Sequence, residues 1–324
     1  MDRKLFVTSL AATAAVSKPA SEAVAAESDF NLDTPTGTIF GTLLFPSAGG
    51  PVPGALIVAG SGPTDRNGNS PSLALDTYKK LAVALADRGI ASVRYDKRGV
   101  ALSHAAGGDE STLRFGTYVD DAVAWLQKLH ADKRFAGVSL VGHSEGSLLG
   151  MIAAQRAPVD AYISLEGAGF PADQILRTQL AAQPGIGADL VAECDRVLDR
   201  LVGGHTVTDY PPALVALFRP SIQPYLISWF AYDPRIEIAR LTGRVTIVQG
   251  THDVQVAVAD GRALASANAK ATFVLIDGMT HVLSDDPATT LSAQLTGAYA
   301  DAARPLDTRL IEATVKAIRP TETS

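Results

Sequence analysis

The segment VGHSEGS at 141–147 places Ser144 two residues from a glycine on either side. This G-x-S-x-G spacing is typical of a nucleophile elbow, a tight strand-to-helix turn that holds a serine in strained backbone angles. Glycines at both flanking positions let the neighbouring backbone pass without a Cβ clash. Apolar residues before and after the motif predict the strand and the helix that the turn requires. Ser144 is therefore the candidate nucleophile.

A nucleophilic serine needs a general base, and the base needs a carboxylate that orients it. The chain has six histidines, and His281 is the candidate base because its loop directly follows the last apolar strand. Asp253 directly follows the strand predicted at 245–248 and is the candidate acid. Loops after parallel strands meet at the carboxyl edge of the sheet, where ligands of open α/β folds bind. His143 adjoins the nucleophile, and we expect it to point into the scaffold in a structural role.

The attack of a serine on an acyl group creates an oxyanion that needs preorganised N–H donors. One candidate donor is the backbone N–H of Glu145, because it lies at a helix N-terminus where the dipole favours negative charge. The second is expected in the loop Gly60-Ser61-Gly62-Pro63, which follows the apolar run ALIVA at 55–59. Ser61 is favoured as this donor, with Gly62 next.

The elements that must position these residues alternate along the chain. After an early antiparallel strand or hairpin at 36–45, strands are predicted at 55–59, 90–95, 138–141, 161–165, 245–248 and 272–276. Helices are predicted at 78–88, 118–130, 147–157, 258–267 and 306–318. Strands that alternate with helices predict an α/β fold with a parallel sheet covered on both faces.

Residues 170–240 break this alternation, since they contain no clear strand, carry seven prolines and favour helix. A structureless loop of that length is improbable in a compact domain. We therefore predict a helical cap at 170–240, inserted into a core formed by 27–169 and 241–324.

The first 26 residues resemble a secretory signal peptide. A short, mainly basic start precedes an apolar, alanine-rich run, and Ala23-Val24-Ala25 offers a small-x-small cleavage pattern. The alternative is a disordered N-terminal tail. The prediction is a periplasmic or secreted protein if the signal works, and a cytoplasmic one otherwise.

Composition excludes several classes of protein. The net charge of −6 disfavours nucleic acid and anionic membranes as partners. The one cysteine, Cys194, allows neither an intramolecular disulfide nor a cysteine-rich metal site. No stretch after the leader is long and apolar enough to span a bilayer. The oligomeric state stays open.

With these motifs in place, the chain resembles a bacterial branch of the α/β-hydrolases described as esterase-like or serine-aminopeptidase-like. The matching stretches are GSGPTDRNGN (60–69), RYDKRG (94–99), GHSEGS (142–147), THDVQV (251–256) and GMTHVL (278–283). The order nucleophile, acid, base is also that of the α/β-hydrolases, and not that of chymotrypsin or subtilisin. The resemblance implies a mostly parallel sheet of about eight strands, a helical cap after the sixth strand and no cofactor.

The chain departs from this family in two places. Residues 100–103 replace the usual glycine-rich continuation, and Glu166 stands where a small residue is usual. We also expect Asp65, Arg66, Asp96 and Arg98 to form ion pairs that brace the loops beside the site.

The predicted activity is hydrolysis of small carboxylic esters through an acyl-enzyme intermediate. The same residues would serve a serine aminopeptidase, an amidase or an acyltransferase, and a non-catalytic binding protein on this scaffold is the rival from another class. Glu145 and Glu166 bear on the choice, because an aminopeptidase needs negative charge for the ammonium group of its substrate. Alternatively, Glu145 only complements the helix dipole and Glu166 only pairs with an arginine of the cap.

Overall fold

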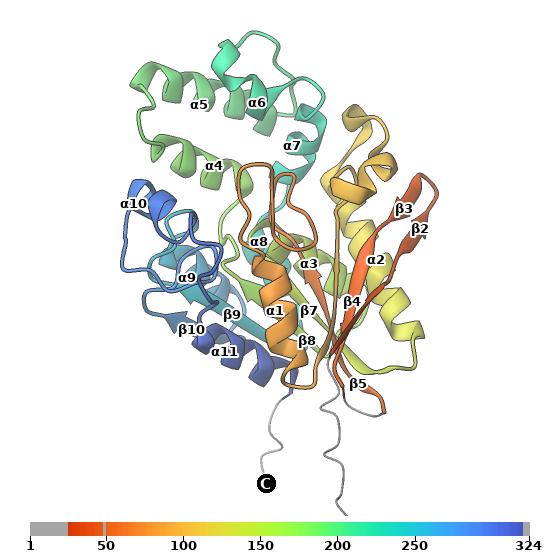
Figure 1. The fold of residues 1–324 in the computed structure, drawn as a ribbon. Coiled ribbons are helices and arrows are strands. Elements are labelled where there is room, and N and C mark those ends of the chain that lie inside the picture. The colour runs from red at the N-terminus through yellow and green to blue at the C-terminus, as the bar shows by residue number, and fades with distance from the viewer. Residues whose placement is uncertain (1–24, 48–49, 320–324) are drawn as a thin grey trace, which may run out of the picture.

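The computed structural model describes residues 25–47 and 50–319. Its centre is an eight-stranded sheet in the order β1-β4-β6-β5-β7-β8-β9-β10 (Figure 1). These strands span Ala26–Asp29 (β1), Gly41–Phe45 (β4), Ala91–Tyr95 (β6), Val52–Val58 (β5), Phe135–His143 (β7), Ala161–Leu165 (β8), Arg244–Gly250 (β9) and Thr272–Ile276 (β10). Strand β4 runs antiparallel to β1 and β6, and the other neighbouring pairs are parallel. The predicted fold class, a mostly parallel eight-stranded sheet, is confirmed.

Helices cover both faces of the sheet, because its central strands are apolar on both faces. In β5, Leu56 and Val58 pack into one core cluster, whereas Ala55 and Ile57 pack into the other. The first cluster is covered by α2 (Phe115–Ala131), α3 (Glu145–Arg156), α8 (Pro234–Ala239) and α9 (Val258–Ala267). The second is covered by α1 (Thr77–Ala86) and α11 (Thr308–Ile318). Burial on both faces explains why ALIVA is an unbroken apolar run rather than an alternating one.

The strand register brings the loops of interest to one edge. Val58 at the end of β5 pairs with Gly142 in β7, and His143 pairs with Leu165 at the end of β8. Leu165 in turn pairs with Val248, and the end of β10 pairs with Gly250. The loops after β5, β7, β8, β9 and β10 therefore start at nearly the same height, at the carboxyl ends of parallel strands.

A helical segment lies over this edge (Figure 1). It follows β8, the sixth strand of the large sheet along the chain, and contains α4 (Ala172–Ala181), α5 (Ala188–Val202), the 3₁₀ helix η3 (Pro212–Leu214), α6 (Val215–Phe218) and α7 (Gln223–Phe230). We call residues 170–233 the cap. Its inner face is apolar, with Leu198, Leu201 and Phe218 fully buried. Helix α7 contacts α2 of the core, while α8 packs beneath the cap on α3 and α9.

Some elements lie outside the sequence-based predictions. The early strand region divides into a hairpin of β2 (Leu32–Thr34) and β3 (Gly37–Ile39) followed by β4. Short helices occur at Ala101–Gly107 (η1), Glu110–Thr112 (η2) and Leu291–Thr296 (α10). Residues 1–24 of the predicted leader lie outside the described residues, whereas Ala26 already pairs with Phe45 in the sheet.

Candidate active site

Ser144 occupies a strained turn between β7 and α3. Its φ of 54° and ψ of −122° lie in a region that residues with a Cβ rarely adopt. The flanking glycines are required by the space available. A Cβ on Gly142 would lie 2.3 Å from the Gly146 carbonyl oxygen, and a Cβ on Gly146 would lie 2.2 Å from that of Val58. The G-x-S-x-G motif thus forms the elbow that its spacing predicts.

Asp253 and His281 form a buried pair at the same edge. His281 Nδ1 lies 2.7 Å from Asp253 Oδ2, and the Asp253 side chain has no solvent exposure. Burial alone would raise the pKa of Asp253, but the His281 ring, Glu166 and the Val256 N–H outweigh it and leave this pKa below its usual value. An ionised carboxylate on Nδ1 leaves Nε2 of the imidazole free to accept a proton. Within the described residues Ser144 Oγ makes no hydrogen bond to His281, as is common in unliganded sites.

His143 connects the base to the loop after β5. Its Nε2 lies 2.9 Å from the His281 carbonyl oxygen, which can only accept, so Nε2 carries the hydrogen. Its Nδ1 then accepts from the Tyr78 hydroxyl at 2.9 Å, and that hydroxyl accepts the Gly60 N–H. Burial, and then the nearby His281, lower the pKa of His143 to about 3. His143 is therefore neutral and structural, as its sequence position predicts, and it also supports the His281 loop.

The candidate oxyanion donors lie beside Ser144. A Cβ on Gly60 would lie 3.1 Å from Ser144 Cβ, so the loop passes directly over the serine. Lys97 Nζ donates to the Gly60 carbonyl at 2.5 Å. Because a trans peptide directs its C=O and N–H to opposite sides, this bond fixes the direction of the Ser61 N–H. Among the described residues, the N–H groups of Ser61, Gly62 and Glu145 have no hydrogen-bond partner, which leaves them available to a ligand.

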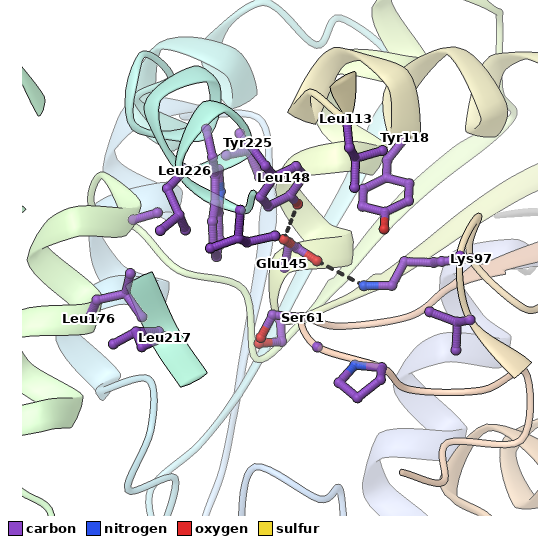
Figure 2. A pocket seen from close by; sticks show the side chains of 18 of the residues that line it. Ser61, Lys97, Leu113, Tyr118, Glu145, Leu148, Leu176, Leu217, Tyr225 and Leu226 are labelled. Carbon is purple, nitrogen blue, oxygen red and sulfur yellow. Dashed lines mark hydrogen bonds and ion pairs between the residues drawn. The ribbon is translucent and has the colours of Figure 1, made fainter. Parts of the chain in front are cut away.

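The Glu145 side chain belongs to a buried polar cluster that the sequence did not reveal. One carboxylate oxygen pairs with Lys97 Nζ at 3.0 Å, and the other accepts from the Tyr225 hydroxyl of α7 (Figure 2). The Lys97 ammonium also lies 5.3 Å from the centre of the Tyr118 ring. Glu145 thus meets a cation and a hydroxyl, and within the described part of the chain its carboxylate accepts no backbone N–H of α3.

A cavity of about 750 Å³ opens between the cap and the edge of the sheet. Ser61 and the Lys97–Glu145 pair lie on its core side (Figure 2). Ser144 also lines it. Much of the remaining wall is apolar and comes from both the cap and the core: Leu113, Leu148, Leu176, Leu217, Leu226 and Trp229. Such a cavity suits a ligand with an apolar body whose reactive group reaches Ser144.

The predicted ion pairs around the site are correct in part. Arg66 pairs with Asp96 at 2.7 Å. Arg98 pairs instead with Asp121 of α2, at 2.5 Å. Asp65 accepts backbone N–H groups within its own turn rather than a cation, which corrects the prediction for that residue.

Several contributors were missed from the sequence: Tyr78, Lys97, Tyr225 and Asp121. Lys97 had a signal, since it lies in RYDKRG directly after a buried strand, at the edge where the other loops meet. Tyr225 had no such sequence signal, because the fold of the cap decides which of its residues lies over the edge of the sheet.

No metal centre is evident at this edge or elsewhere in the described part of the chain, where no group of three His, Cys, Asp or Glu side chains could hold an ion. Residues 25–47 and 50–319 also contain no helix long and apolar enough to cross a membrane.

The sheet, the elbow and the strand-end loops define the chain as a member of the α/β-hydrolase superfamily. Residues 74–182 match the family model described as serine aminopeptidase, S33. The esterase EstD of Thermotoga maritima is 28% identical over 223 residues, which cover 68% of this chain and 51% of EstD. The chain thus spans about half the length of this curated relative.

Solved structures show the same fold at low sequence identity. Est1E from Butyrivibrio proteoclasticus, solved with ferulic acid bound, is 17% identical with a TM-score of 0.56, over 84% of this chain and 97% of Est1E. The esterase Pf2001 of Pyrococcus furiosus is 11% identical with a TM-score of 0.56, over 91% of this chain and 94% of that one. These solved structures and this chain share the α/β-hydrolase fold.

Proposed function

We propose that this protein hydrolyses carboxylic esters through an acyl-enzyme. In this mechanism Ser144 Oγ attacks the acyl carbon while His281 Nε2 takes the hydroxyl proton. Asp253 holds the imidazole tautomer and stabilises the imidazolium that forms. The proton then passes to the leaving alcohol, and water repeats the sequence on the acyl-enzyme. The observation that carries the proposal is the buried Asp253–His281 pair at the same sheet edge as the strained Ser144 elbow.

The oxyanion of each tetrahedral intermediate would be stabilised by the N–H groups of Ser61 and Glu145, with Gly62 as the next candidate. Their lack of partners in the described structure supports this assignment. The Lys97 bond to the Gly60 carbonyl would keep the Ser61 donor oriented, so the site would need little reorganisation during the reaction.

The aminopeptidase alternative is favoured by the match of residues 74–182 to the S33 family model. It requires an unpaired negative charge for the substrate ammonium. Glu145 lines the cavity, but the Lys97 ammonium already neutralises it. Glu166 has no solvent exposure and does not line the cavity. The charges around the cavity therefore support a neutral ester over an aminoacyl amide.

The test is a panel of p-nitrophenyl esters and aminoacyl-p-nitroanilides with purified wild type and Ser144→Ala. We expect the esters to be cleaved, the anilides to react little or not at all, and Ser144→Ala to lower kcat by about 10⁴-fold. A fluorophosphonate probe should label the wild type and not the variant. Retention of esterase activity by Ser144→Ala would remove the assignment, and an unlabelled, inactive wild type would favour a binding protein.

We also propose that residues 1–26 direct export. The support is the basic start and the small-x-small pattern of the sequence. Expression of the full chain, followed by cell fractionation and N-terminal sequencing, tests this. A mature protein that begins near Ala26 is expected, and an uncleaved chain in the cytoplasm would exclude it.

A further inference from the structure

Glu166 is a buried carboxyl that the proposed mechanism does not use. It directly follows β8, with a φ of 49° in the left-handed region and no solvent exposure. Its backbone N–H donates to the Val248 carbonyl at 3.0 Å, which holds the residue against β9. The strained backbone and the complete burial place its side chain inside the protein, below the loop that carries Asp253.

No cation in the described part of the chain neutralises Glu166. Its Oε1 accepts the Gly250 N–H at 2.8 Å, and its Oε2 accepts from the Gln249 side-chain amide. Within the described residues no lysine or arginine forms an ion pair with it, so the expected pairing with a cap arginine is wrong. A buried carboxylate without a cation is expensive, which favours the protonated form.

Asp253 has room for one more donor. Its Oδ1 accepts the N–H groups of Gln255 and Val256 at 2.7 and 2.8 Å, and its Oδ2 faces His281. The Glu166 carboxyl lies within hydrogen-bonding reach of this aspartate. Two carboxyl groups in dry contact cannot both carry a charge, so the pair holds one proton.

The surroundings decide which carboxyl holds that proton. Burial, and then the charge of Asp253, raise the pKa of Glu166 well above its usual value. Burial also acts on Asp253, but His281 and the backbone donors keep the pKa of that carboxyl low. The proton therefore belongs to Glu166, and the negative charge belongs to Asp253.

Other titratable groups face the pair from neighbouring elements. His143 on β7 has its ring centre 4.8 Å from that of His281 and is neutral. Asp260 on α9 accepts the Gly169 and Ala257 N–H groups, and burial raises its pKa. Burial raises the pKa of Tyr299 too, and its hydroxyl accepts from Gln255. These groups leave Asp253 as the one low-pKa carboxyl at His281.

We propose that Glu166 is a neutral carboxylic acid that donates a hydrogen bond to Asp253 and thereby positions the carboxylate beneath His281. This inference rests on the proposed function, in which Asp253 orients the base. Glu166 acts as a positioning residue through Asp253, so it contacts neither substrate nor nucleophile. A neutral donor supports the aspartate without adding a second negative charge at the base.

The kinetic test compares Glu166→Leu with Glu166→Gln, because the Gln amide can still donate to Asp253 while it cannot ionise. Loss of a hydrogen bond to a charged group predicts a fall in kcat of about 10–100-fold for the Leu variant. The Gln variant should recover most of that loss and keep the acid limb of the kcat/KM profile where the wild type has it. Glu237→Gln, another buried carboxyl away from the site, is the matched control.

Two outcomes contradict the inference. Wild-type activity in Glu166→Leu would show that the donor is not needed. A shift of the acid limb to lower pH in Glu166→Gln would show that an ionised Glu166 had been stabilising the imidazolium.

A second measurement does not depend on activity. Infrared difference spectra of wild type against Glu166→Gln at neutral pH should show a protonated carboxyl C=O band in the wild type alone. The same comparison in the Ser144→Ala background separates the two proposals. If Ser144→Ala stays active, the proposed function fails while the band still reports on Glu166. If the band is absent in folded wild type, the inference about Glu166 fails whatever the kinetics.

Discussion

Glu145 and Glu166 are buried carboxyl groups that follow neighbouring strands of the same sheet edge, yet the protein treats their charge in opposite ways. Glu145 meets the Lys97 ammonium and the Tyr225 hydroxyl, so a cation and a hydroxyl donor face its carboxylate. Glu166 meets backbone and amide donors and the charged Asp253, so it keeps a proton. Burial of a carboxyl is compensated by a cation in one case and by protonation in the other.

The difference lies in the loops that reach each carboxyl. The loop after β6 carries Lys97 across the end of β5 to Glu145. The end of β9 brings the Gly250 N–H and the Gln249 amide to Glu166, and the loop after β9 brings Asp253. No cation reaches Glu166 within the described residues. The first arrangement leaves a neutral wall beside the cavity, and the second leaves a single charge behind His281. The following predictions test this contrast, from the largest expected effect to the smallest.

The largest loss of activity is expected when the Asp253 carboxylate, the single negative charge beside His281, is removed. Asp253→Asn should lower kcat for esters by about 10⁴-fold, because the amide cannot hold the productive tautomer of His281. Steady-state kinetics on a p-nitrophenyl ester measures it, with the exposed Asp33→Asn as control. A loss below about tenfold would mean that Glu166 or another group can take the place of Asp253.

The buried ion pair between Lys97 and Glu145 should contribute to the free energy of unfolding. Lys97→Met leaves the Glu145 carboxylate buried without a cation, and breaking such a pair costs about 3–5 kcal/mol in the free energy of unfolding. The double variant Lys97→Met/Glu145→Gln removes both charges and should recover much of that loss. Urea denaturation at pH 7.5 measures both variants. Equal stability of the single and double variants would show that Lys97 stabilises the loop after β5 and not the charge of Glu145.

The surroundings of these two carboxyls also show which features of the site can be predicted from the sequence and which cannot. The fold and the strand-end positions of Ser144, Asp253 and His281 follow from local pattern, because apolar runs, glycine spacing and chain order are all visible in one dimension. Once the strands pair in a parallel sheet, their register brings the loops that follow them to the same edge. The predicted donors Ser61, Gly62 and Glu145 also lie at the expected edge of the sheet.

The partners of Glu145 and Glu166 could not be predicted in the same way. Lys97 and Tyr225 lie far from Glu145 in sequence, and Tyr225 arrives through the fold of the cap. For Glu166, charge alone suggests a cap arginine as one alternative, whereas the structure provides Gly250, Gln249 and Asp253. The groups around a buried carboxyl are set by packing between loops that are distant in sequence. A local sequence pattern does not predict such packing.

A third prediction concerns His143, which is buried between Tyr78 and the His281 loop. Its pKa of about 3 in the folded protein lies below the value of about 6.5 of an unfolded histidine, so only the unfolded chain gains a proton between these values. Its contribution to stability is therefore present above pH 6.5 and is lost as the pH falls toward 3. Between pH 8 and pH 5 the loss should be about 2 kcal/mol in the wild type.

Urea unfolding of wild type and His143→Gln at these two pH values isolates the contribution of His143. The variant lacks this titration, so the stability difference between the two proteins should narrow by that amount on acidification. A difference that stays constant with pH would mean that His143 is protonated in the folded state, and the relay from Gly60 through Tyr78 to the His281 carbonyl would then need another hydrogen arrangement.

The smallest expected effect tests whether Glu145 is truly neutralised toward a ligand. p-Nitrophenyl propionate and p-nitrophenyl alaninate differ by one α-amino group, so the ratio of their kcat/KM values reports on ammonium recognition and cancels general losses of activity. In the wild type the Lys97 ammonium should give the propionyl ester the higher kcat/KM, because the cavity wall offers no unpaired negative charge.

Lys97→Met exposes the Glu145 carboxylate to the cavity and should shift the ratio toward the alaninate by about tenfold, the effect of one weakly screened charge pair. In Lys97→Met/Glu145→Gln the shift should disappear, since neither charge remains. A wild type that already prefers the alaninate, with a preference lost in the double variant, would instead make Glu145 an ammonium-binding group and restore the aminopeptidase alternative.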